Sequence, residues 1–127
     1  MGKRVLVIDD DEPTRKLFSQ ALEDTEYQVE TVESGEKGIE KARDAKYDLI
    51  FLDLKMLGLD GVQTLRELRR IDEDVPVYIV TAFHSEFFNK LKRATADGTD
   101  FEVFKKPTSS DQIVFLAKSV LEGPEGF

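Results

Sequence analysis

The sequence lacks cysteine and has a single histidine, His84. Without cysteine there can be no disulfide bond, no thiolate nucleophile and no cysteine-ligated zinc, and one histidine cannot build a multi-histidine metal site. We interpret His84, which follows the fourth apolar run, as a surface residue. Any bound metal would therefore be held by oxygen ligands.

Long apolar runs and an excess of positive charge are also missing. No stretch approaches the roughly 18 apolar residues of a membrane span, and only a short apolar run follows Met1–Arg4, which does not suit a signal peptide. We therefore expect a cytoplasmic protein without membrane contact. The formal net charge of −8 argues against direct nucleic-acid binding by this domain, because phosphate contacts need clustered lysine and arginine. A DNA-binding function would belong to another domain or partner.

What the sequence does contain is a regular alternation of short apolar runs with longer segments of helical period. With 127 residues and 40% hydrophobic content, it fits one domain. The alternation predicts an α/β fold with a parallel sheet. The last helical segment stops before Gly123-Pro124, so we expect a domain over residues 1–121 and a tail or linker start over 122–127. Strands are expected at residues 4–9, 27–32, 48–53, 76–81 and 101–105.

Polar side chains stand where these predicted strands end. Asp9 and Asp10 close the first apolar run, Asp53 the third, Thr81 the fourth, and Lys106 follows the fifth. The carboxyl ends of parallel strands meet at one edge of a sheet, where open α/β folds place their functional crevice. We therefore expect these five residues to form one site.

The three acids in this group predict a bound cation. At about 4 Å and an effective dielectric near 20, each pair of carboxylates would repel by roughly 4 kcal/mol. Mg²⁺ relieves such repulsion and binds oxygen ligands, here Asp9, Asp10, Asp53 and the backbone carbonyl of Lys55.

The remaining residues of the group suit phosphoryl chemistry. Asp53 can act as a nucleophile that holds a phosphoryl group as an acyl phosphate, and Lys106 can pair with the phosphate. Thr81 can donate its hydroxyl to a phosphate oxygen, which would draw the following loop inward and shift a two-state equilibrium.

Five segments contain or adjoin these site residues: VLVIDDD (5–11), DLIFLDLKM (48–56), Asp60-Gly61, IVTA (79–82) and KKP (105–107). In order and spacing they resemble the motifs of the receiver domain of two-component response regulators. The resemblance covers about residues 3 to 121. It implies a flavodoxin-like, doubly wound, five-stranded parallel sheet in the order 2-1-3-4-5 with five helices.

The resemblance also implies a role for each site residue. Asp9 and Asp10 would bind Mg²⁺, Asp53 would accept a phosphoryl group from a sensor histidine kinase or phosphotransfer protein, Thr81 would switch, and Lys106 would be the family lysine. The switch would control an output domain or partner, and a homodimer or effector could use the face formed by helix 4, strand 5 and helix 5.

The sequence departs from the family pattern at three places. Leu57 replaces the usual proline after Met56, Val103 stands where relatives often carry a switching tyrosine or phenylalanine, and Thr99-Asp100 replaces Gly-Ala. Leu57 alters the active-site loop, and Val103 puts in doubt a switch that depends on an aromatic ring at that position.

Two other functions compete with this prediction. A haloacid-dehalogenase-type phosphatase also uses a nucleophilic aspartate, but needs a second acid two residues later, where this chain has Lys55; we therefore do not expect an enzyme. A module that keeps the fold but not the phosphorylation switch is the other alternative, which Leu57 and Val103 encourage.

Overall fold

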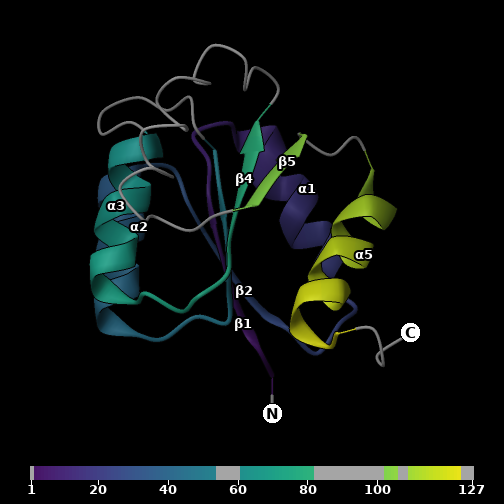
Figure 1. Ribbon diagram of the computed structural model, residues 1–127. Helices are drawn as coiled ribbons and strands as arrows, with labels where there is room; N and C mark the ends of the chain where they lie inside the picture. The colour runs from purple at the N-terminus through teal and green to yellow at the C-terminus, as the bar shows by residue number, and fades with distance from the viewer. Residues whose placement is uncertain (1, 54–60, 82–101, 106–108, 124–127) are drawn as a thin grey trace.

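The computed structural model describes residues 2–53, 61–81, 102–105 and 109–123, and these form a parallel sheet with helices on both faces (Figure 1). The sheet order is β2-β1-β3-β4-β5, as the family resemblance implies. Every pair of neighbouring strands is parallel, and each strand begins and ends within one residue of its predicted bounds. The strands are β1 (Arg4–Ile8), β2 (Gln28–Val32), β3 (Leu49–Leu52), β4 (Val77–Thr81) and β5 (Glu102–Lys105).

Four helices lie in the described residues. The helix expected between the fourth and fifth strands would fall in residues 82–101, outside the described residues. None of the described helices combines the length and apolar composition needed to cross a membrane. The helices are α1 (Glu12–Leu22), α2 (Gly35–Asp44), α3 (Gly61–Ile71) and α5 (Ser110–Leu121).

The core consists of two apolar layers, one on each face of the sheet. Alternate residues of a strand point to opposite faces, and β1 shows this clearly, because Leu6 and Ile8 join one cluster while Val5 and Val7 join the other. The first cluster packs under α2 and α3, and the second under α1 and α5. Burial on both faces explains why β1 and β3 are almost wholly apolar.

The strand register aligns the carboxyl ends of β1, β2 and β3 at the same level along the sheet. Ile8, the last residue of β1, is aligned with Val32 at the end of β2 and with Leu52 at the end of β3. The residues that follow β1 and β3 therefore emerge side by side at the carboxyl edge of the sheet. These residues are Asp9 and Asp53.

The helices begin at side-chain caps. Asp11, Ser34 and Ser109 each precede a helix in an extended conformation and accept a hydrogen bond from the backbone N–H three residues later. Ser109 thus caps the last helix. At the other end of α5, Gly123 has a φ of 71°, a left-handed conformation that ends helices and that glycine adopts without strain.

Two serines, one just before α5 and one inside it, provide a matched test of this cap. Ser109 Oγ accepts from the Gln112 N–H at 3.3 Å, whereas Ser119, inside the helix, donates to its own chain at the Phe115 carbonyl. We expect Ser109→Ala to lower the free energy of unfolding by about 1 kcal/mol. Ser119→Ala should leave it unchanged or raise it by a few tenths of a kcal/mol, because alanine favours the helix interior. Urea denaturation measures both, and equal losses in the two variants would contradict the capping role.

Candidate functional site

Three carboxylates meet at the carboxyl edge of the sheet. Asp9, Asp10 and Asp53 each offer one oxygen, and these oxygens all lie within 4.8 Å of one another. Asp9 is 2% exposed and Asp53 is 5% exposed, while Asp10 is the more open of the three. The structure therefore brings together the three acids that the sequence predicts as metal ligands.

Backbone hydrogen bonds between the strand ends hold this arrangement. The Asp53 N–H donates to the Ile8 carbonyl at 2.9 Å, and the Asp9 N–H donates to the Val32 carbonyl at 3.1 Å. Both bonds continue the ladder of the sheet past the last strand residue. The backbone positions of Asp9 and Asp53 thus depend on the strands of the sheet rather than on a loop.

Asp9 is also oriented by the start of α1. Its Oδ1 accepts the Asp11 N–H at 2.9 Å, and its backbone carbonyl accepts a hydrogen bond from Arg15 Nη1 at 2.8 Å. Asp11 in turn caps the helix by accepting the Thr14 N–H at 3.1 Å. These contacts fix one oxygen of Asp9 in place beside the cluster.

Arg15 was not among the site residues predicted from the sequence. A usable signal was present, because helical side chains lean toward the helix N-terminus, and Arg15 lies four residues after the cap residue Asp11. A cation at that position reaches back to the chain that leads into the helix.

Of the other predicted site residues, the structure describes only the backbone of Thr81. Thr81 ends β4 and is paired with Lys105 of β5, so the backbone of Thr81 lies at the carboxyl edge of the sheet. Lys55, Leu57 and Lys106 lie outside the described residues, as do His84 and Thr99-Asp100. Val103 belongs to β5 and is paired with Ile79.

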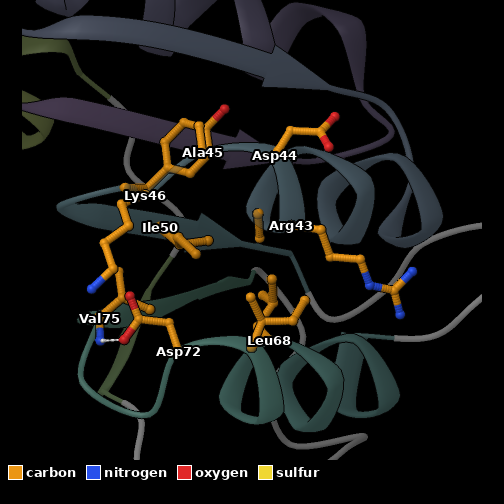
Figure 2. A pocket seen from close by; sticks show the side chains of 11 residues that line it. Arg43, Asp44, Ala45, Lys46, Ile50, Leu68, Asp72 and Val75 are labelled. Atoms are coloured by element: carbon orange, nitrogen blue, oxygen red, sulfur yellow. Dashed lines mark hydrogen bonds between the residues drawn. The ribbon is translucent and has the colours of Figure 1, made fainter.

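A separate hollow of about 380 Å³ lies between α2 and α3 at the other end of the sheet (Figure 2). Its wall includes segments that precede β3 and β4, such as Ala45 and Val75, so it lies at the amino ends of these strands. Asp72, on the rim, accepts the Val75 N–H at 3.1 Å. The hollow therefore does not form part of the acid cluster.

The donor set of the acid cluster fits a hard divalent cation. All three groups are carboxylates, which suit Mg²⁺. Two oxygens bound to one Mg²⁺ lie at most about 4.2 Å apart, as Mg–O distances near 2.1 Å imply. Oxygens within 4.8 Å of one another need only small side-chain movements to share such an ion. Without a cation, the same proximity places the buried acids under mutual repulsion.

Comparison with known proteins gives the same family as the motifs. Residues 5–118 match the family described as the response regulator receiver domain. The chain is 35% identical over 118 residues to the transcriptional regulatory protein ResD of Bacillus subtilis, which covers 93% of this chain and 48% of ResD. The chain thus spans about half the length of this relative.

Solved structures show the same fold. The chemotaxis protein CheY4 of Vibrio cholerae superposes with a TM-score of 0.81 at 26% identity, over 95% of this chain and all of CheY4. The response regulator TrrA of Thermotoga maritima, solved in complex with Mg²⁺ and BeF, gives a TM-score of 0.77 at 29% identity over 94% of this chain and 99% of TrrA. Sequence match, fold and acid cluster agree, and the chain belongs to the family of response regulator receiver domains.

Proposed function

We propose that Asp53 accepts a phosphoryl group from a sensor histidine kinase or phosphotransfer protein, with Mg²⁺ held by Asp9, Asp10, Asp53 and the backbone carbonyl of Lys55. The observation that carries this proposal is the convergence of three carboxylate oxygens within 4.8 Å at the ends of two buried strands. Phosphorylation on aspartate and Mg²⁺ binding are general in the family to which the chain belongs. The complex of TrrA with Mg²⁺ and BeF supports the same assignment.

The proposed step is a phosphoryl transfer between two side chains. An Asp53 oxygen attacks phosphorus, the bond from phosphorus to the donor imidazole nitrogen breaks, and its electron pair returns to that nitrogen. Bound Mg²⁺ would offset the charge that gathers on the phosphoryl oxygens and the carboxylates. The hydrogen bond from the Asp53 N–H to the Ile8 carbonyl supports this step, because it holds the backbone that carries the acceptor carboxylate. The contacts of Asp9 with Asp11 and Arg15 support its proposed role beside the cation.

Thr81 and Lys106 complete the proposed site. The hydroxyl of Thr81 would donate to a phosphate oxygen and the ammonium of Lys106 would pair with the phosphate, which spreads the charge of the modified Asp53. The position of Thr81 at the end of β4, paired with Lys105, is compatible with both roles. Movement of the segment after Thr81 would then select the active conformation.

The switched surface would be the face of helix 4, strand 5 and helix 5, used for a homodimer or an effector. Phe115 of α5 supports this proposal, because it is 65% exposed and is the only large hydrophobic side chain so exposed in the described part of the chain. ResD is a transcriptional regulator about twice as long as this chain. We therefore propose that any DNA binding belongs to an output domain outside the receiver unit, which we place at residues 1–121, with residues 122–127 as a tail or linker start.

The acceptor role of Asp53 predicts loss of labelling in Asp53→Asn. Incubation with labelled acetyl phosphate and Mg²⁺ should modify the wild type and leave this variant unlabelled, since an amide oxygen is a poor nucleophile. Asp48→Asn is the matched control, because Asp48 precedes the same strand at its opposite end and accepts the Arg4 N–H at 2.8 Å. It should keep the label. Equal labelling of the wild type and Asp53→Asn would refute the assignment, and no labelling of the wild type would favour the phosphorylation-independent module.

The metal site predicts a stabilising effect of Mg²⁺ on folding. At 100 times its dissociation constant, Mg²⁺ should raise the free energy of unfolding of the wild type by about 2.7 kcal/mol, because it binds only the folded state. Asp10→Asn should remove most of this gain in the free energy of unfolding. Asp11→Asn should retain it, since asparagine caps a helix as well as aspartate does. Thermal denaturation with and without Mg²⁺ measures the gain, and an equal gain in Asp10→Asn would exclude Asp10 as a ligand.

A further inference from the structure

At Gly38, helix α2 packs so closely on the end of strand β1 that a side chain there would overlap Ile8. A Cβ atom at position 38 would lie 2.3 Å from Cδ1 and 2.8 Å from Cγ1 of Ile8. Real Cβ atoms do not approach other atoms so closely, so a methyl group at Gly38 would displace Ile8. The absence of a side chain at this position is what permits the contact.

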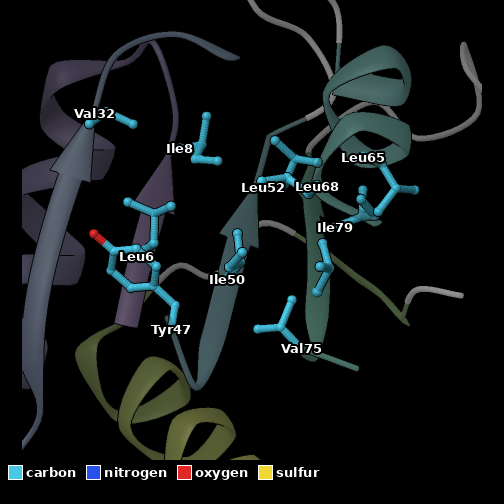
Figure 3. Packing of buried hydrophobic residues seen from close by; sticks show 11 residues of the cluster. Leu6, Ile8, Val32, Tyr47, Ile50, Leu52, Leu65, Leu68, Val75 and Ile79 are labelled. Carbon is cyan, nitrogen blue, oxygen red and sulfur yellow. The ribbon is translucent and has the colours of Figure 1, made fainter. Parts of the chain in front are cut away.

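Ile8 has little freedom to move aside. It is 0% exposed and belongs to the cluster of buried residues that also contains Val32 and Leu52 (Figure 3). Both of these residues are its partners in the sheet register. In a packed core, added volume forces side chains off their preferred rotamers and shifts the backbone. Pressure from position 38 is therefore transmitted to the β1 backbone.

The β1 backbone at Ile8 leads directly to two of the acids. Asp9 is the next residue, and the Ile8 carbonyl accepts the Asp53 N–H at 2.9 Å. One peptide unit thus carries Asp9 covalently and holds Asp53 by a hydrogen bond. A shift of this unit changes the separation of the two buried carboxylates.

We propose that Gly38 is a positioning residue for the cation site, which acts through Ile8 to set the spacing between the Asp9 and Asp53 carboxylates. This inference rests on the proposed function, in which these acids share Mg²⁺. The expected consequence is that the site distinguishes Mg²⁺ from Ca²⁺. Mg²⁺ demands near-ideal octahedral geometry at 2.0–2.1 Å, whereas Ca²⁺ accepts irregular geometry at about 2.3–2.6 Å. A disturbed spacing should therefore penalise Mg²⁺ more than Ca²⁺.

The test compares the dissociation constants for Mg²⁺ and Ca²⁺ by amide NMR titration of the whole chain. We expect Gly38→Ala to weaken Mg²⁺ binding by about tenfold while the dissociation constant for Ca²⁺ changes by less than about threefold. Val75→Ala is the control for a general loss of packing, because Val75 is buried in the same cluster but precedes β4 at the far end of the sheet. It should leave the ratio of the two constants unchanged.

A second substitution tests whether the effect passes through Ile8. Ile8→Val removes Cδ1, the atom closest to a Cβ at position 38. The double variant Gly38→Ala/Ile8→Val should recover part of the wild-type Mg²⁺ to Ca²⁺ ratio, because the 2.3 Å contact is removed while the 2.8 Å contact with Cγ1 remains. If Gly38→Ala alone does not fold, the double variant must still fold, and it must bind Mg²⁺ more weakly relative to Ca²⁺ than the wild type does.

The outcomes separate this inference from the proposed function. Loss of Mg²⁺ binding in Asp53→Asn, together with an unchanged ratio in Gly38→Ala, would overturn the positioning role and leave the metal site standing. Unaltered Mg²⁺ binding in Asp53→Asn would overturn the metal site itself. A changed ratio in Gly38→Ala that Ile8→Val does not bring closer to the wild-type value would overturn the route through Ile8.

Discussion

Repulsion among three carboxylates is the constraint on which the site of this protein depends. Asp9 and Asp53 are almost fully buried, and an oxygen of Asp10 lies within 4.8 Å of an oxygen from each. Charges this close at buried positions cost several kcal/mol unless a cation neutralises them. The same repulsion would favour a divalent ion at the site, and the proposed acceptance of a dianionic phosphoryl group depends on that ion.

The fold imposes this proximity through its central strands. Ile8 and Leu52 end β1 and β3 at the same level, and the sheet hydrogen bonds continue to the residues that follow them. Apolar side chains on both faces of these strands hold the ends in place, so the acids cannot separate without loss of core packing. The packing of the core therefore keeps the carboxylates close together in spite of their mutual repulsion.

Much of this arrangement could be predicted from the sequence because the signals are local. The strands β1, β3 and β4 are short, largely apolar runs, and Asp9 and Asp53 directly follow two of them. Parallel pairing then puts both acids at the carboxyl edge of the sheet. Strand order came from the family resemblance, since periodicity reveals strands but not their neighbours. The contacts of Arg15 with the Asp9 carbonyl and of Gly38 with Ile8 were not predicted, because they depend on how closely a helix packs against the sheet. The side-chain roles of Thr81 and Lys106 stay predictions.

The free energy of unfolding of Asp53→Asn, compared with the wild type in EDTA and in saturating Mg²⁺, tests the central claim most directly. Removal of one buried charge should make the variant more stable than the wild type in EDTA, by about 1 kcal/mol or more, because repulsion is relieved. In saturating Mg²⁺ the order should reverse, since only the wild type keeps its full set of carboxylate ligands. A variant that is less stable than the wild type by the same amount in both conditions would contradict the account.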